Sequence, residues 1–206
     1  IKRYSYQYAG LYLISTFPAK GYDIDDYPAV KDYLLKFGIE RLEQTGKEHI
    51  INGERVKARK KTSNKWYETQ DSISYWDEFS KPKIIWKRVG SIIRFSYDTT
   101  GILGLDSTCF ATGESIQYIC CVLNSPMGHY LLNGAPRTGT GDLLISVQAV
   151  EPLRFPLISD NQKIIFQELL DKVILGKQVD NEINRLIFDL YGLSEEERVY
   201  IIENYA

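Results

Sequence analysis

Cysteine and histidine are scarce in this sequence, with three cysteines and two histidines among 206 residues. Cys120 and Cys121 are adjacent in an apolar segment, so they are not expected to form a disulfide with each other. Together with Cys109 they make an odd set that is typical of a reducing cytoplasm. Neither His49 nor His129 stands at a zinc-ligand spacing from a cysteine. The sequence therefore excludes a disulfide-stapled fold and gives no reason to expect a metal site.

Long apolar runs are missing too. The longest, residues 116–123 and 185–191, are far shorter than the roughly 20 residues that cross a bilayer, so no transmembrane segment is expected. The chain begins at Ile1 instead of Met and shows no signal peptide, so we expect a piece of a longer protein. With 44% hydrophobic and 25% charged residues, the composition is that of a folded globular chain rather than a disordered one.

The motifs of several enzyme classes are absent. The run Thr138-Gly139-Thr140-Gly141-Asp142 lacks the Gly-Lys-Ser/Thr end and the preceding strand of a phosphate-binding Walker loop. No Gly-x-Gly-x-x-Gly fingerprint, no Asp/Asn-Pro-Pro-Tyr/Phe segment of amino-methyltransferases and no Pro-Asp…Glu-x-Lys nuclease core is found. A Cys-His nucleophile pair would need His129 to meet a cysteine in an electropositive pocket. We expect core thiols instead, and therefore no catalysis and no cofactor in this part of the protein.

Charge is distributed unevenly along the chain. Residues 1–159 hold 20 Lys and Arg against 17 Asp and Glu, whereas residues 160–206 hold 5 against 10. Two runs contain no acidic residue. The first basic strip consists of Arg55, Lys57, Arg59, Lys60, Lys61 and Lys65, and the second of Lys81, Lys83, Lys87, Arg88 and Arg94. We interpret both, together with the aromatic residues beside them, as phosphate-facing surfaces; the alternative is a solvated face.

A glycine-rich segment around Arg137 is the most specific candidate. Gly134, Gly139 and Gly141 permit positive backbone φ angles and close approach to a ligand. Arg137 carries a planar guanidinium that suits guanine O6 and N7 in the major groove, or two phosphate oxygens. We expect Arg137 and residues 138–140 at the tip of a loop facing DNA, with an ordinary surface turn as the alternative.

Hydrophobic periodicity and turn residues predict a mixed α/β (α+β) fold. The expected strands cover residues 4–17, 83–86, 91–97 and 143–147, with a short one around Cys109. The expected helices cover residues 28–42, 116–123, 126–132, 162–177 and 179–191, with a last short one after Ser194. Residues 45–64 are interpreted as an exposed connection or mobile loop. The expected organisation is a mixed β-sheet body with flanking helices over residues 1–159, followed by a helical C-terminal segment over residues 160–206 that packs on the body or on a missing catalytic domain.

Several helix ends carry their own signals. Ser115 and Ser125 are expected N-caps, and Gly192 is expected to stop the helix before it. Ser194 with Glu197 has the spacing of a capping box.

Five short motifs, in this order, resemble one family. They are Lys65-Trp66-Tyr67-Glu68, Phe79-Ser80-Lys81-Pro82-Lys83-Ile84, Leu123-Asn124-Ser125-Pro126, the Arg137 loop before Pro152-Leu153-Arg154-Phe155-Pro156, and Leu190-Tyr191-Gly192-Leu193-Ser194-Glu195-Glu196-Glu197. The chain resembles, over roughly residues 29–205, the target-recognition (specificity) domain of Type IIG restriction-modification enzymes and adenine-specific DNA methyltransferases, akin to Type I specificity subunits.

The resemblance implies a bacterial, cytoplasmic DNA-recognition domain that is not itself an enzyme. It would position an attached adenine-N6 methyltransferase, and in some proteins a nuclease, on double-stranded DNA. S-adenosylmethionine would bind the methyltransferase domain of the same chain. The alternatives are a protein-interaction or scaffold module without DNA binding and, with little support, a Cys-dependent enzyme. The expected DNA-binding residues are Arg59, Lys60, Lys61, Ser63, Asn64, Lys65, Lys81, Lys83, Arg88, Arg137, Thr138, Gly139 and Thr140.

Overall fold

The computed structural model describes residues 1–206, which divide into two compact units. Unit 1 consists of Ile1–Ala9 together with Asp77–Ala206, and unit 2 of Gly10–Trp76. The mixed α/β class is confirmed, since helices and three small antiparallel sheets are present. The unit boundaries lie after Ala9 and after Trp76. The helices that follow residue 159 pack on the same core as the strands before it, which is one of the two arrangements expected for them.

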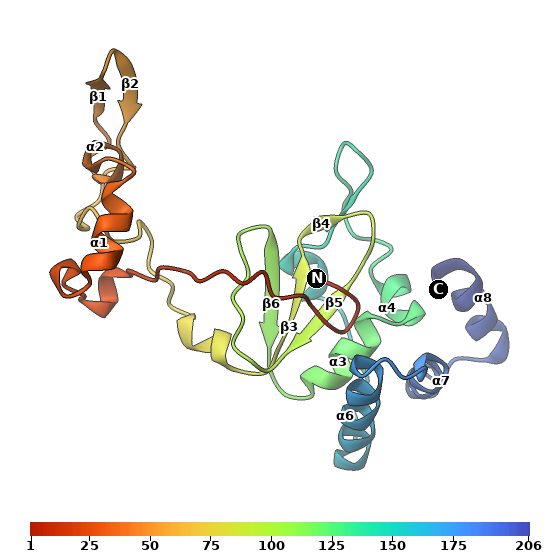
Figure 1. Ribbon diagram of the computed structural model, residues 1–206. Coiled ribbons are helices and arrows are strands. Elements are labelled where there is room, and N and C mark those ends of the chain that lie inside the picture. The colour runs from red at the N-terminus through yellow and green to blue at the C-terminus, as the bar shows by residue number, and fades with distance from the viewer. The chain divides into compact units, whose positions relative to one another are not determined.

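A three-stranded sheet forms the centre of unit 1 (Figure 1). Strand β3 (Lys83–Lys87) lies in the middle and pairs antiparallel with β5 (Phe95–Asp98) and β6 (Thr108–Thr112). The β3 segment Ile84-Ile85-Trp86 is buried, as expected of a central strand with both faces covered. The strands expected over residues 83–86 and around Cys109 are thus confirmed, whereas the strand expected over residues 91–97 begins only at Phe95. A second, two-stranded sheet pairs β4 (Val89–Gly90) with β7 (Leu143–Leu144).

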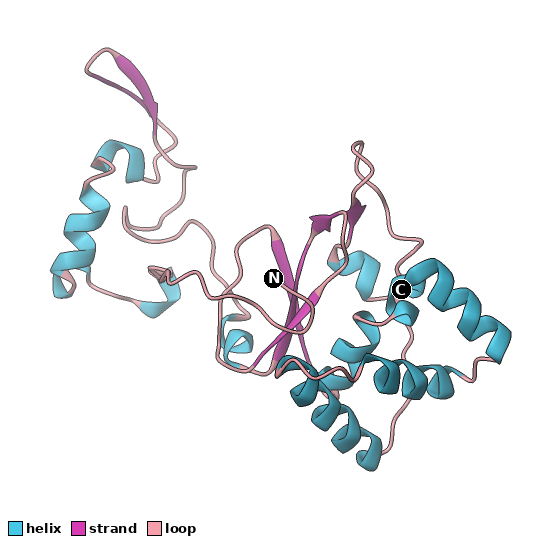
Figure 2. Cartoon of the chain, turned by 45° about the vertical axis from the view of Figure 1, so that its right-hand side comes forward, coloured by secondary structure: helices cyan, strands magenta, loops and turns pink.

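Helix α3 (Ile116–Leu123) lies against this sheet, and other helices of unit 1 pack on α3 or on its neighbours (Figures 1 and 2). Helix α3 packs on β5 and β3, α6 packs on α3, and α8 packs on α4. Six of the eight residues of α3 are buried, so α3 is the centre of the core. No helix is long and apolar enough to cross a membrane. The helices of unit 1 are α3 Ile116–Leu123, α4 Pro126–Leu131, α5 Val147–Val150, α6 Asp160–Ile174, α7 Asp180–Tyr191 and α8 Glu195–Tyr205.

The turn between α3 and α4 is held by polar side chains. The Asn124 amide accepts a hydrogen bond from Phe95 N and donates one to Phe95 O, so it extends the ladder of β5 to the end of α3. Ser125 caps α4 by accepting from Gly128 N, as expected. A Cβ added at Gly128 would lie 2.2 Å from the carbonyl oxygen of Val122, so the close approach of the two helices requires glycine here. The Asn124-Ser125 motif therefore serves the framework of unit 1.

Other helix ends agree only in part with the sequence. Gly192 ends α7 in the left-handed conformation, and Ser194 with Glu197 forms the expected capping box of α8. Ser115 occupies the N-cap position of α3 with φ 55°, but its side chain makes no capping hydrogen bond. The expected side-chain cap is therefore absent. The expected strand 143–147 ends at Leu144, and α5 begins at Val147.

The strand expected over residues 4–17 is also wrong. Only Tyr4 pairs with the sheet, through an isolated parallel bridge to Ser96. Tyr4 has φ 65°, which is incompatible with a continuous strand. The segment is nevertheless anchored, because Ser96 Oγ donates to the carbonyls of Lys2 and Ser5.

Unit 2 consists of short elements. The expected helix 28–42 is interrupted at Gly38, whose φ is 85°. Residues 45–64, expected as a loop, instead contain a regular β-hairpin, because Asn52 and Gly53 adopt φ 52° and 85° at the turn. The elements are η1 Pro18–Lys20, η2 Ile24–Asp26, α1 Pro28–Leu35, α2 Ile39–Leu42, β1 Glu48–Ile51 and β2 Glu54–Lys57, with η3 Trp76–Ser80 at the passage back to unit 1.

Candidate nucleic-acid interface

The glycine-rich segment 136–144, the Arg137 hairpin, is an exposed loop of unit 1 that projects beyond β4 (Figure 1). Arg137 pairs with Leu143 in an isolated antiparallel bridge, and Leu144 N donates to Pro136 O. Of the glycines expected to take positive φ, only Gly141 does so, with φ 88°. The loop is thus a short, hydrogen-bonded hairpin with residues 138–141 at its tip.

Polar side chains cover this tip. One guanidinium nitrogen of Arg137, Nη1, donates to Gly141 O at 3.0 Å, so Nε and Nη2 keep their donors for a ligand. The hydroxyls of Thr138 and Thr140 lie 2.8 Å apart, and Thr140 donates to Asp142 at 3.2 Å. Arg137 and Thr140 are exposed. The tip therefore presents a fixed arginine, two hydroxyls and one carboxylate, which are groups able to read base edges.

The small sheet of β4 and β7 brings two distant parts of the sequence together. Val89 pairs with Leu144 and Gly90 with Leu143. The base of the Arg137 hairpin is therefore paired with the middle of the stretch that carries the second basic strip. Lys87 and Arg88 precede β4 directly, and both are exposed. Arg94, in the loop after β4, is exposed as well. None of the cations Lys87, Arg88, Arg94 and Arg137 forms an ion pair within the chain.

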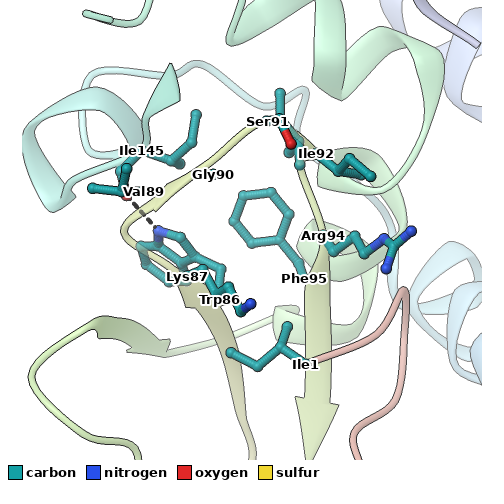
Figure 3. Close-up of a pocket in the computed structure, with 11 residues that line it drawn as sticks. Ile1, Trp86, Lys87, Val89, Gly90, Ser91, Ile92, Arg94, Phe95 and Ile145 are labelled. Carbon is teal, nitrogen blue, oxygen red and sulfur yellow. Dashed lines mark hydrogen bonds between the residues drawn. The ribbon is translucent and has the colours of Figure 1, made fainter. Parts of the chain in front are cut away.

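A hollow of about 180 Å³ lies beside β4 (Figure 3). Trp86 and Phe95 form its inner side, and Trp86 Nε1 donates to Ile145 O at 2.7 Å. Both rings are almost completely buried, at 2% and 0% exposure, so they offer little surface for stacking. Figure 3 shows the Arg94 side chain extending away from the two rings. Trp86 and Phe95 lie beneath the loop that carries Arg94, so these two rings serve the packing of that loop.

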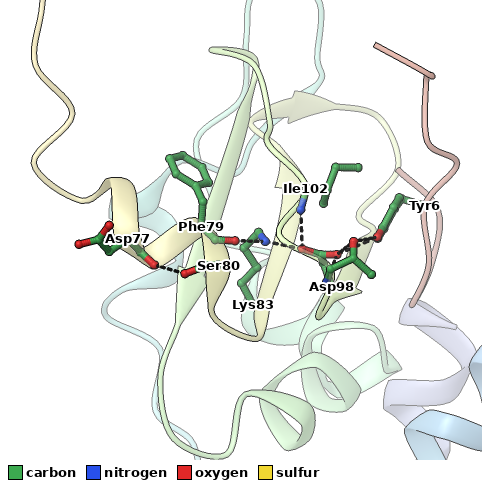
Figure 4. A network of polar contacts seen from close by, with 8 residues as sticks. Tyr6, Asp77, Phe79, Ser80, Lys83, Asp98 and Ile102 are labelled. Atoms are coloured by element: carbon green, nitrogen blue, oxygen red, sulfur yellow. Dashed lines mark hydrogen bonds and ion pairs between the residues drawn. The ribbon is translucent and has the colours of Figure 1, made fainter. Parts of the chain in front are cut away.

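Lys83 is not available to DNA, contrary to expectation. Its ammonium group is fully buried, forms an ion pair with Asp98 and donates to Phe79 O at 2.6 Å (Figure 4). The reason is its place at the start of the central strand, where Phe79 and the segment that follows Asp98, through Thr100 and Ile102, surround the ion pair. Lys81 lies outside the core, but its ammonium group is paired with Glu78 at 2.6 Å.

Asp98 is the centre of this buried network. Its carboxylate also accepts hydrogen bonds from Tyr6 Oη, from Thr100 N and Oγ1, and from Ile102 N. Burial by itself raises the pKa of Asp98, but the hydrogen bonds from Lys83, Thr100 and Tyr6 outweigh that effect and hold its pKa at about 2. Through the Tyr6 hydroxyl, the network ties the N-terminal segment to the sheet.

Arg59 of the first basic strip is likewise engaged inside its own unit. Its guanidinium donates to the carbonyls of Leu42, Trp66 and Glu68. Desolvation lowers its pKa, as expected of a charge partly removed from water. Arg59 therefore holds the base of the β1–β2 hairpin and is not counted as a DNA contact.

The other expected contacts of unit 2 divide into two groups. Lys60, Lys61 and Ser63 are exposed, and Lys65 extends over the Tyr67 ring at 5.5 Å. Asn64 is half-buried and donates to the carbonyls of Thr69 and Gln70, so its amide group stabilises a turn.

No nucleophile pair is formed by the cysteines and His129. Cys120 and Cys121 are fully buried, and burial raises the pKa of Cys120 to about 12 and that of Cys121 well above its usual range. His129 Nδ1 lies 3.0 Å from Tyr205 O, and desolvation lowers the pKa of its ring. The thiols belong to the core and the imidazole to the contact between α4 and α8.

Sequence comparison gives no further guide to function, because no protein-family model and no curated protein matches the chain.

Sequence reasoning missed the β1–β2 hairpin, with Ile50 exposed on it. The signal was present: Asn52-Gly53 between two runs containing β-branched residues is a strong hairpin pattern.

Proposed function

We propose that this chain is a sequence-specific DNA-recognition domain that positions an attached adenine-N6 methyltransferase on double-stranded DNA in the bacterial cytoplasm. The methyltransferase, its S-adenosylmethionine and any nuclease would belong to another part of the same protein. The proposal assigns no chemical step to the residues described above. It rests on the motif resemblance and on one structural observation.

That observation is the pairing of β4 with β7. The pairing brings the base of the Arg137 hairpin next to Lys87 and Arg88, which directly precede β4, and Arg94 follows in the loop after β4. All three are exposed and form no ion pair within the chain. In DNA complexes, cations on a surface contact phosphates and fix the register, whereas side chains on a protruding element read base edges. We assign the phosphate contacts to Lys87, Arg88 and Arg94, and base reading to Arg137 with Thr138 and Thr140.

The proposal is tested by the salt dependence of DNA binding. We expect the chain to bind duplex DNA with an affinity that falls as salt rises, and Arg88→Gln and Arg94→Gln each to reduce the slope of log K against log salt by about 0.9. Lys177→Gln is the matched control, because Lys177 is exposed but lies between α6 and α7, within the acidic part of the chain over residues 160–206. Fluorescence anisotropy at several salt concentrations measures both effects.

Arg137 separates base reading from phosphate binding. If Arg137 contacts guanine, Arg137→Ala loses about 1–3 kcal/mol of discrimination at one base pair of a site selected from random duplexes. Equal weakening on all sequences would instead assign Arg137 to phosphate. A chain that is indifferent to DNA, or whose binding ignores all three substitutions, would overturn the proposal and favour a protein-interaction module.

A further inference from the structure

The β1–β2 hairpin of unit 2 is a rigid two-stranded ribbon. Its register pairs Glu48 with Lys57, His49 with Val56, Ile50 with Arg55, and Ile51 with Glu54. The ladder continues beyond the strands, because Ala58 N donates to Lys47 O at 2.9 Å and Gly46 N to Arg59 O at 2.8 Å. The Arg59 guanidinium then fastens this base to three backbone carbonyls. The ribbon is therefore held at both ends, by its tight turn and by its base.

The two faces of the ribbon differ. Side chains alternate between the faces of a strand, so His49 and Val56 share one face, which is half-buried and directed to α2, where His49 Nε2 lies 3.8 Å from Glu43. The opposite face holds Glu48, Ile50, Arg55 and Lys57, all of which are exposed. Ile50 is 77% exposed. An isoleucine thus stands uncovered in the middle of a polar face, directly across from an arginine.

The charge on and beside this face is mainly positive. Arg55, Lys57, Lys60 and Lys61 are exposed and form no ion pair within the chain, whereas the ribbon itself carries only Glu48 and Glu54 as acids. The dimensions of the ribbon favour DNA over a protein or a membrane as its partner. The major groove is about 12 Å wide and admits a two-stranded β-ribbon, whose strands lie about 4.8 Å apart.

We propose that the exposed face of the β1–β2 ribbon enters the major groove, where Ile50 contacts the C5 methyl group of a thymine and Arg55 contacts a neighbouring guanine. Thymine is the base that offers an apolar group in this groove, and arginine binds guanine O6 and N7 through two hydrogen bonds. Lys57, Lys60 and Lys61 contact the flanking phosphates. This inference rests on the proposed function, and adds a second base-reading element that is separate from the Arg137 hairpin.

The experiment removes single methyl groups from the DNA. A duplex selected from a random library by the full chain is resynthesised with each thymine in turn replaced by deoxyuridine, which lacks only the C5 methyl. We expect the wild-type chain to lose roughly fourfold in affinity at one such position, about the effect of one buried methyl group. Ile50→Ala should bind the thymine and deoxyuridine duplexes equally. Leu175→Ala is the control, because Leu175 is also 77% exposed and should keep the methyl sensitivity.

Arg55→Lys provides the second readout. It keeps the positive charge and should leave the salt slope unchanged, but a repeated selection should lose the preference for guanine at the adjacent position, since lysine cannot make the two-pronged contact. If the chain binds DNA but no thymine methyl matters, or if Ile50→Ala keeps wild-type sensitivity, the ribbon inference is overturned while the proposed function stands. Absence of any DNA binding would overturn both.

Discussion

Lys83 and Asp98 are the residues of unit 1 whose charges depend most on each other. Both side chains are fully buried, and a buried charge without its partner costs several kcal/mol. Carbonyl, hydroxyl and backbone groups from Phe79, Tyr6 and Thr100 complete the network. The pair therefore fixes the start of β3 against the end of β5, and connects both strands to the N-terminal segment.

Removing one charge of this pair should be costly. We expect Asp98→Asn to lower the free energy of unfolding by about 3–5 kcal/mol, because it leaves the Lys83 ammonium buried without a counter-charge. The double variant Lys83→Met/Asp98→Asn should be more stable than Asp98→Asn alone. Urea denaturation at pH 7 measures both. A double variant no more stable than Asp98→Asn would contradict this prediction.

The same pair predicts a pH dependence. The folded-state pKa of Asp98, about 2, lies below its ordinary value of 3.8, so its contribution to stability is complete above the unfolded pKa and is lost as pH falls toward 2. The loss amounts to about 2 kcal/mol. Unfolding curves measured between about pH 5 and about pH 2, the window of carboxyl titration, should show a smaller change for Asp98→Asn than for the wild type.

At the scale of elements, periodic and capped segments could be predicted from the sequence, whereas exposure could not. Helix α7 and the capping box of α8 follow from apolar spacing and from Ser194 with Glu197, which act locally. The burial of Lys83 depends on what covers the sheet, and charge alone carries no information on that. The same holds for Arg59, whose partners are backbone carbonyls brought close by the fold. Within the candidate interface, the exposed Arg137 loop could be predicted, but its position beside Arg88 depends on the long-range pairing of β4 with β7.

Helix α7 offers a graded test of its apolar stripe. Ile183 is fully buried, whereas Leu186 is only partly buried against the core. We expect Ile183→Ala to cost about 2–5 kcal/mol of unfolding free energy, because it leaves a cavity in the core, and Leu186→Ala to cost clearly less. Thermal and urea unfolding of the two variants give the order. A larger loss at Leu186 would contradict the described orientation of the helix.

At the scale of the whole molecule, unit 2 is an insertion in unit 1. Unit 1 uses residues 1–9 and 77–206, and the chain leaves it after Ala9 and returns at Asp77. Within unit 2 the first and last parts are joined to each other, since Thr69 N donates to Thr16 O and Thr16 Oγ1 donates to Tyr67 O. The two proposed reading elements, the Arg137 hairpin and the β1–β2 ribbon, therefore belong to different units. Such an arrangement lets loops of one unit vary without disturbing the core of the other.

The insertion predicts that unit 1 folds without unit 2. Replacing residues 10–76 by a short Gly/Ser linker should leave a chain that unfolds cooperatively, because the core cluster lies almost entirely within residues 77–206 and Tyr4. Deleting residues 1–76 should be much more damaging, since it also removes the Tyr4 bridge to Ser96 and the Tyr6 hydrogen bond to Asp98. Trp86 becomes the only tryptophan in both variants and is buried, so its fluorescence during urea unfolding reports the state of the sheet. If the linker variant shows no cooperative transition, unit 1 needs unit 2 in order to fold. Keeping residues 1–9 would then not be sufficient for unit 1 to fold without unit 2.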